Sequence, residues 1–479
     1  MKLNLHITKV TIACFILLST VNLSVKAQEV ITLQKAIDRA LERNLTIKQA
    51  QLTEALSTED YRQAKNNLLP NLFVNSQGSY NFGRATDQTN LAINNGSFFY
   101  NTNSASAQIT VFQGGQLRNQ IIQNRLLLDA DKSNTAKIKN DLILNVVTQY
   151  LSILTNQDLV AAAQQQIGVA KITLDRAQKN FDVGNQTLAD LSQAKAQQST
   201  AELNLTTAQN QLDLSILVLK QYMEMPPLTP ITIEKPDVSK LTVATAYDPQ
   251  NVLNTALAIN PDVVLAQTRE KAYLQAIKIA KGGYYPTLSF SGSVVTQYSS
   301  TSKAVLGTVQ GFQTVNGNIN GVPSTIDLPT TTPVFGGTTS FATQLSNNLN
   351  QSVGFNLQIP IFNRFFTRTA VRKAKINYEN AQVSTQLSKN NLSKTIIQAV
   401  WDVQAAEKKY QSMQQTYNAN KEAFNVIQER YNVGLVNSLD YNTSLTNLNK
   451  SQFDLIQAQY EVVFRSKVID YYLGNPITL

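Results

Sequence analysis

Residues 108–112 read QITVF and residues 358–362 read QIPIF, and these two similar segments begin a duplication that decides the fold. Adding 250 to every position from Gln108 to Pro226 gives an aligned segment from Gln358 to Pro476 without gaps. Self-similarity at a fixed offset is the signature of a repeated structural unit. We therefore predict an internal two-fold repeat.

Upstream of these segments the offset is 216, which pairs Asn44 with Asn260 and Pro70 with Pro286. The change from 216 to 250 leaves 34 extra residues in the second half, and a long insertion in one loop is the simplest cause. The predicted organisation is a first repeat over 28–226, a proline-rich equatorial linker over 227–248 and a second repeat over 249–479.

Four segments alternate between apolar and polar residues with the period of a β-strand. One of them places Ala105, Ala107, Ile109 and Val111 against serine, glutamine and threonine. Alternation alone fits a soluble hairpin with one solvent-exposed face. However, there are four such runs of about 9 to 12 residues, which is the length of tilted strands that cross a bilayer. The predicted strands are about 71–82, 104–112, 287–298 and 351–362.

Four strands cannot close a barrel, and an open sheet edge in lipid leaves backbone groups without hydrogen bonds. Closure therefore needs several chains, and two, three or four copies would give eight, twelve or sixteen strands. The connecting loops, about 83–103 and 299–350, are rich in asparagine, glycine, serine and threonine, and we expect them on the cell exterior.

Apolar residues recur at every seventh position between Gly115 and Val183, which contains no proline. This period favours a left-handed coiled coil, and about 70 residues make a helix of about 100 Å. Two helices of about half the length together run back along each long helix. We predict long helical hairpins with tips at about 181–191 and 431–441, and further helices at 33–68 and 249–284. A coiled-coil stalk is the alternative, although the strand pairs that join the helices twice argue against it.

The first 27 residues resemble a cleavable signal peptide, with lysines followed by an apolar run. Lipid attachment at Cys14 is a less favoured alternative. This segment holds the only histidine, His6, and the only cysteine. The mature chain is expected to lack histidine- or cysteine-based catalysis and metal sites, and we predict no enzyme, no cofactor and no nucleic-acid partner. No later apolar run reaches the ~20 residues of a membrane-spanning helix, so a bilayer crossing would have to use strands.

The duplicated tip carries the most specific motif, Phe181-Asp182-Val183-Gly184 with Asp190 in one half and Arg430-Tyr431-Asn432-Val433-Gly434 with Asp440 in the other. With these motifs the chain resembles the TolC-like outer membrane efflux protein family over essentially all of its expected mature length. The resemblance implies an α+β membrane protein: a trimeric twelve-stranded β-barrel continued by an α-helical barrel into the periplasm. It also implies a periplasmic adaptor and an inner-membrane pump as partners.

By the same resemblance, Asp190 and Tyr431 match a pair that holds the tip closed, and Asp440 matches a constriction carboxylate. Three copies of Asp440 around an axis would form a negative ring that favours cations. The simpler interpretation is helix capping, because each aspartate lies three residues after a capping residue. Thr443 and Val436 depart from the family pattern of a second aspartate and an arginine latch. The expected adaptor contacts are Gly184, Asn185, Gly434 and Leu435.

These expectations combine into one function, passive export through an outer-membrane exit duct. The sequence does not separate drug efflux from protein secretion through a type I system. A coiled-coil structural or adhesive surface protein without a pore is the alternative from another class.

Overall fold

The structure is a computed structural model that describes residues 29–86, 93–236 and 246–475. The expected signal peptide, 1–27, lies outside the described residues. The chain forms two compact units. Unit 1 comprises residues 1–56, 129–268 and 382–479, and unit 2 comprises residues 57–128 and 269–381.

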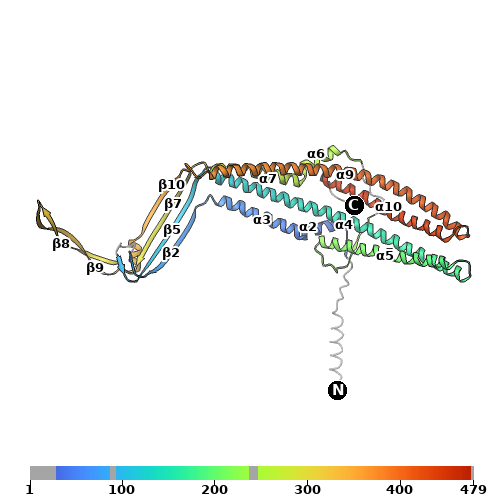
Figure 1. Ribbon diagram of the computed structural model, residues 1–479, viewed down its shortest axis with the longest axis horizontal. Coiled ribbons are helices and arrows are strands. Elements are labelled where there is room, and N and C mark those ends of the chain that lie inside the picture. Colours follow the sequence, from blue (N-terminus) through green and yellow to red (C-terminus); the bar gives the residue numbers. More distant parts are fainter. Residues whose placement is uncertain (1–28, 87–92, 237–245, 476–479) are drawn as a thin grey trace, which may run out of the picture. The chain divides into compact units, whose positions relative to one another are not determined.

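Unit 2 contains a four-stranded antiparallel sheet, in which neighbouring strands lie side by side in the order β10-β7-β5-β2 (Figure 1). Strands β2 and β10 are its two edges, and their residues are exposed almost throughout. The four strands are β2 (Asn71–Asn81), β5 (Phe98–Gln113), β7 (Thr287–Ser299) and β10 (Asn350–Gln358).

The register of this sheet separates apolar from polar residues. Val74 pairs with Ala105, which pairs with Val294 on its other side, and Phe290 pairs with Phe355. Because side chains alternate across a strand, these residues share one face of the sheet. The opposite face carries mainly hydroxyl and amide side chains: Asn75, Gln77, Ser104, Ser106, Gln108, Ser291, Ser293, Ser352 and Asn356. The sheet is amphipathic.

Two strand boundaries differ by more than one residue from the sequence prediction. Strand β5 begins at Phe98 rather than at 104, because it pairs with the whole of β2 up to Asn81. Strand β10 ends at Gln358 rather than at 362, because Pro360 has no N–H to donate to a neighbouring strand.

The two connections that were predicted to be loops contain further strands. Residues 84–95 hold the short pair β3 (Arg84–Thr86) and β4 (Ile93–Asn95). The longer connection forms a two-stranded ribbon, β8 (Lys303–Ile319) and β9 (Val322–Thr338), and then the short helix α8 (Phe341–Asn347). Its composition of glycine, threonine and proline concealed the alternation of valine, isoleucine and leucine within it.

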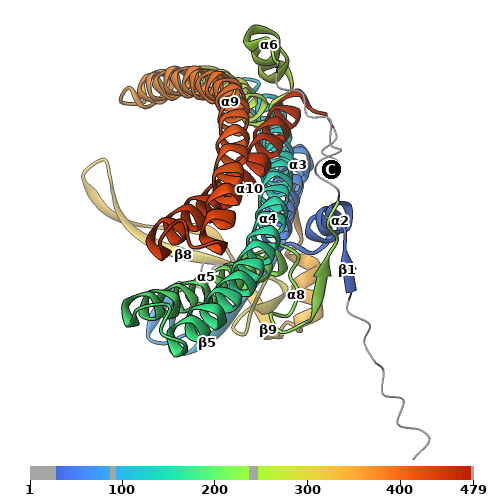
Figure 2. The ribbon, with the colours of Figure 1, turned by 90° about the vertical axis from the view of Figure 1, so that its right-hand side faces the viewer.

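Unit 1 contains most of two antiparallel helical hairpins, α4–α5 and α9–α10 (Figure 2). The first helix of each hairpin has 67 residues, about 100 Å at 1.5 Å per residue. Among the described residues, no helix has the length and apolar character needed to span a membrane. The bounds are α4 (Gln116–Asp182), α5 (Leu188–Tyr222), α9 (Phe366–Asn432) and α10 (Ser438–Leu473).

The prediction of single helices over 33–68 and 249–284 is wrong, because an asparagine interrupts each. Asn44 adopts an extended backbone conformation, and its side-chain oxygen accepts hydrogen bonds from the N–H groups of Thr46 and Ile47. Asn260 accepts from Asp262 N at 3.0 Å, and the proline that follows disfavours helical geometry at Asn260. The result is α2 (Leu33–Arg43) with α3 (Leu45–Asn66), and α6 (Pro249–Ile259) with α7 (Pro261–Gly282).

The largest core of unit 1 lies around Tyr150 of α4, which is 2% exposed. Its hydroxyl lies 2.7 Å from Glu234 O and 3.2 Å from Ile31 O. These carbonyls flank a parallel strand pair, β1 (Glu29–Ile31) and β6 (Ile231–Ile233), which the proline-rich composition of 227–248 did not indicate. Burial raises the pKa of Tyr150 above the ordinary tyrosine value of about 10, so its hydroxyl stays protonated even in moderately alkaline solution.

Candidate gate at the hairpin tips

The two hairpins turn in the same way. At the first tip, Asn185 N donates to Asn180 O at 2.8 Å and Gly184 has φ +75°. At the second, Leu435 N donates to Arg430 O at 2.8 Å and Gly434 has φ +78°. A left-handed glycine that closes a helix with such a 6→1 bond is a Schellman motif, which explains why each tip has glycine at this position.

Both returning helices begin with a side-chain cap, as the capping interpretation predicts. Thr187 accepts from Asp190 N at 3.2 Å, and the Asp190 carboxylate accepts from Thr187 N at 3.0 Å, which completes a capping box. At the second tip, Asn437 accepts from Asp440 N at 2.8 Å. The Asp440 carboxylate itself has no hydrogen-bond partner in the part of the chain that the structure describes.

The Asp190 carboxylate also bridges the two hairpins. Its second oxygen accepts a hydrogen bond from the hydroxyl of Ser438, the first residue of α10. The hydrogen bond from Ser438, followed by the side-chain and backbone hydrogen bonds from Thr187, holds the pKa of the Asp190 carboxyl below its usual value. Asp190 is therefore an anion at neutral pH, and its carboxylate both caps α5 and accepts a hydrogen bond from the other hairpin.

Tyr431 makes a second cross-hairpin contact. Gln186 Nε2 donates to its hydroxyl at 2.9 Å, and the Arg176 guanidinium lies 5.1 Å from the centre of its ring. Arg176 also donates to the side-chain and backbone oxygens of Asn432. The ring of Tyr431 also stacks on that of Tyr441, with centroids 4.6 Å apart. A small apolar cluster with Phe424 and Leu445 fixes Tyr441.

Asp190 and Tyr431 lie on the same seam between the hairpins, but each has its own partner and no hydrogen bond joins the two. Sequence reasoning missed the partners Ser438, Gln186 and Arg176, because nothing in a linear sequence indicates which residue of the other hairpin a side chain will contact. Of the two departures from the family pattern, Val436 is half-buried and Thr443 is exposed.

The expected adaptor-contact residues are all exposed at the tips. Leu435 is 68% exposed, and the neighbouring Val183 and Val433 are each 69% exposed. Leu188 and Leu439 add two further exposed apolar side chains. Each tip therefore presents a small apolar surface around its glycine.

Comparison with known proteins places this geometry in a family. The sequence matches the family described as outer membrane efflux protein over residues 36–223 and 252–475, most of the chain. The chain belongs to the outer membrane efflux protein family. It is accordingly an outer-membrane exit channel.

Two relatives and one solved structure show the extent of the similarity. The chain is 22% identical to the outer membrane protein TolC of Escherichia coli over 87% of this chain and 77% of that protein. It is 21% identical to the outer membrane efflux protein BepC of Brucella suis, over 96% and 88%. Its fold resembles that of the outer membrane protein VceC of Vibrio cholerae, with a TM-score of 0.72, 18% identity and coverage of 92% and 94%.

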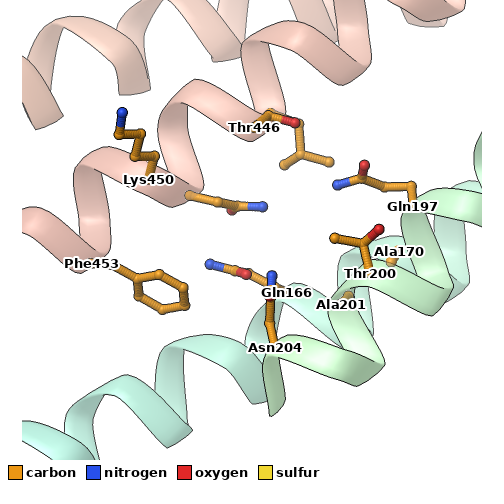
Figure 3. A pocket seen from close by; sticks show the side chains of 11 residues that line it. Gln166, Ala170, Gln197, Thr200, Ala201, Asn204, Thr446, Lys450 and Phe453 are labelled. Atoms are coloured by element: carbon orange, nitrogen blue, oxygen red, sulfur yellow. The ribbon is translucent and has the colours of Figure 1, made fainter. Parts of the chain in front are cut away.

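In this efflux protein the seam between the hairpins holds, away from the tip, a cavity of about 310 Å³ between α4–α5 and α10, which is lined by both polar and apolar side chains (Figure 3). Gln166 reaches into it from α4 and is only 6% exposed, yet its Nε2 has no hydrogen-bond partner among the described residues. The same holds for Asn442 Oδ1 and Gln186 Oε1 nearer the tip. The other polar lining residues are Gln197, Thr200, Asn204, Thr446, Asn449 and Lys450.

An amide that stays buried without a hydrogen bond costs about 1–3 kcal/mol of desolvation, and water that enters the cavity beside Gln166 would relieve this cost. By contrast, Tyr150 in the largest core has its hydroxyl hydrogen-bonded. No group of three or more histidine, cysteine, aspartate or glutamate residues that could hold a metal occurs within residues 29–86, 93–236 and 246–475.

Proposed function

We propose that three copies of this chain close a twelve-stranded barrel and form the exit duct of a tripartite efflux or type I secretion system. The observation that carries the proposal is the open, amphipathic four-stranded sheet of unit 2, with β2 and β10 as unpaired edges. Exposed apolar side chains cover one face, including Leu72 at 72%, Val74 at 79%, Val353 at 79% and Phe355 at 72%. Such a face suits lipid, and the polar face suits a water-filled lumen.

The strand directions also favour closure by copies. All neighbouring pairs are antiparallel, and the number of strands is even. The β10 edge of one copy can therefore pair with the β2 edge of the next without breaking the alternation. This pairing would satisfy the edge hydrogen bonds that lipid cannot satisfy.

A row of aromatic rings crosses the sheet near one end of the strands. Tyr80, Phe99, Tyr298 and Phe341 follow one another with ring centroids 5.0–6.2 Å apart. Aromatic girdles of this kind lie at the membrane–water interfaces of barrel proteins. The row supports a membrane position for the remainder of the four strands.

The tip seam supports a gate at the periplasmic end. Asp190 with Ser438, and Tyr431 with Gln186 and Arg176, hold the two hairpins together with a few half-exposed polar contacts. Because these contacts are few and partly exposed to solvent, the hairpins can separate at small cost. Three copies of the exposed Asp440 would add negative charge to the entrance.

The exposed apolar tips support contact with a periplasmic adaptor, through Gly184, Asn185, Gly434 and Leu435. The adaptor would connect the duct to an inner-membrane pump that supplies the energy. Transport through the duct itself would be passive.

Native mass spectrometry and planar-bilayer conductance test this proposal together. We expect a trimer in detergent whose small conductance rises when Asp190→Ala and Tyr431→Ala are combined, with Asp60→Ala on the exposed surface of α3 as the control. A monomer, or a trimer in which the double variant carries no current, would exclude the duct and favour a structural or adhesive protein.

A further inference from the structure

The β8–β9 ribbon has one apolar and one polar face. Its register pairs Val315 with Ile326, Gln313 with Leu328 and Ile319 with Val322. Residues of odd number in β8 and of even number in β9 therefore share a face, on which seven branched aliphatic residues outnumber the polar residues Gln313, Ser324, Thr330 and Thr332. These seven are Val309, Val315, Ile319, Val322, Ile326, Leu328 and Val334, and we call this side the apolar face. The opposite, polar face carries Thr308, Gln310, Thr314, Asn316, Asn318, Thr325, Asp327 and Thr331 together with Phe312 and three prolines, Pro323, Pro329 and Pro333.

The apolar face is uncovered within one chain. Each of its seven aliphatic side chains is between 40% and 61% exposed. An isolated two-stranded ribbon is marginally stable in water, and a contiguous exposed apolar face marks an interaction surface. This ribbon is also the long connection that the first half of the chain lacks, so the duplicated scaffold does not require it.

We propose that the apolar face of the β8–β9 ribbon packs against the same face of the other two copies, so that three ribbons form one assembly. The inference rests on the proposed trimer, which would fix the roots of the three ribbons near one axis. At the root, Ser299 N donates to Gln344 Oε1 at 2.9 Å, and Thr339 N donates to Ser302 O at 2.9 Å. Tethering of this kind raises the effective concentration to the order of mM.

Charge favours a second copy as the occupant. Lys303 and Asp327 are the only charged residues of the ribbon, so identical faces can meet without repulsion. Asp327 lies on the polar face, where it accepts a hydrogen bond from Thr314 Oγ1 at 2.6 Å. Packing between aliphatic faces needs complementary shape and apolar area, and two identical faces can supply both.

A lipid surface or an unrelated protein fits this face less well. The ribbon contains neither tryptophan nor tyrosine, the residues that anchor proteins at membrane interfaces, and Lys303 is its only cation. It also lacks arginine, which with tryptophan and tyrosine dominates the binding energy of most protein interfaces.

The outer edge of β9 is unsuited to pairing with another strand, which leaves the apolar face as the surface for association. Pro323, Pro329 and Pro333 of β9 occupy positions of the same parity, opposite Asn318, Phe312 and Thr308. A proline cannot donate to a ladder, and residues of one parity point their N–H groups the same way. The three prolines therefore remove donors from the outer edge of β9 and oppose strand addition there.

Two adjacent cysteine substitutions test the proposal in a Cys14→Ser background. Val315→Cys lies on the apolar face and Asn316→Cys lies on the polar face one residue away. After mild oxidation of the detergent-purified protein, we expect disulfide-linked dimers for Val315→Cys. Three cysteines around a three-fold axis can form one disulfide, so about two thirds of the chains should be linked. Asn316→Cys should give several-fold less.

Native mass spectrometry of the same samples separates the possible failures. A trimer in which Val315→Cys fails to link, or links no better than Asn316→Cys, overturns this inference and leaves the proposed function intact. Quenching of a fluorophore on Val315→Cys by lipid-borne quenchers in vesicles would overturn it in the same way. A monomeric mass would overturn the proposed function and this inference together.

Discussion

The two hairpin tips share a backbone and differ in their chemistry. Each ends a 67-residue helix with a left-handed glycine, and each starts the returning helix with a side-chain cap. At the first tip the aspartate is held by Thr187 and by Ser438 of the other hairpin. At the second tip the equivalent aspartate, Asp440, is exposed.

The offset of 250 shows where the difference arises. At this offset the residues that bridge the hairpins align with apolar residues: Ser438 aligns with Leu188, Gln186 with Val436, and Arg176 with Val426. The positions that match at this offset build the turn, and the positions that differ build the contacts across the seam. A motif shared by the two hairpins therefore keeps its structural role in both, whereas a contact across the seam depends on neighbours that the hairpins do not share.

The largest expected difference between the tips comes from Ser438→Ala. This substitution removes the hydrogen bond across the seam and leaves the capping box of Asp190 in place. A hydrogen bond to a charged group that is partly exposed contributes about 1 kcal/mol, so the open fraction should rise about fivefold. Single-channel recording in planar bilayers measures this open fraction, the share of time that the channel conducts.

Thr187→Ala is the matched control, because it weakens the cap and keeps the Ser438 contact. It should lower helix stability by about 1 kcal/mol and change the conductance much less. If Ser438→Ala raised the conductance no more than Thr187→Ala did, Asp190 would act as a helix cap alone.

Acidification should open the same seam. The pKa of Asp190 is lower in the folded protein than in the unfolded chain, so the stability that its carboxylate contributes is complete above the usual aspartate value of about 3.9. That stability is lost as the pH falls through the lowered folded value. Conductance should therefore increase below about pH 4. In Ser438→Ala the midpoint should move to higher pH, because the main cause of the shift is gone; an unchanged midpoint would contradict the assignment.

A smaller change in energy is expected from Asp440→Asn at the second tip. At a separation of one Debye length, about 8 Å in physiological salt, each of three exposed charges changes the energy of a passing ion by about 0.1–0.2 kcal/mol. Because the three charges stabilise cations and destabilise anions, the ratio of cation to anion permeability should fall by up to about sevenfold while the open fraction stays the same. Reversal potentials in a salt gradient measure the ratio, with Asp190→Asn as the comparison. A change of gating in Asp440→Asn would mean that the two tips are more alike than their contacts indicate.

The sequence predicted those parts of the molecule that depend on local patterns. Alternation located all four strands of the unit 2 sheet, and the seven-residue period located the long helices. The helix breaks at Asn44 and Asn260 were missed because one capping residue leaves the apolar period intact. The β8–β9 ribbon was missed because glycine, threonine and proline dominate its composition, although its apolar residues alternate.

At the seam, resemblance to a family singled out Asp190 and Tyr431, and the structure brings both to the boundary between the hairpins. Their partners could not be predicted, because Ser438 and Gln186 lie 248 and 245 residues away along the chain. Such contacts depend on how two helices pack, and no short sequence pattern encodes that packing.

The smallest expected difference concerns the turn glycines, where the two tips should respond alike. A Cβ at Gly184 or Gly434 would meet no atom within 4 Å, so Gly→Ala adds no clash at either tip. What remains is the left-handed backbone, φ +75° and φ +78°, which costs an alanine about 1 kcal/mol relative to glycine. Gly184→Ala and Gly434→Ala should therefore lower the stability of the hairpins equally, measured as the melting temperature by circular dichroism, and the double variant should show the sum. If Gly184→Ala were clearly the more damaging, the seam contacts of the first tip would be supporting its turn as well, and the division between a shared scaffold and diverged contacts would fail.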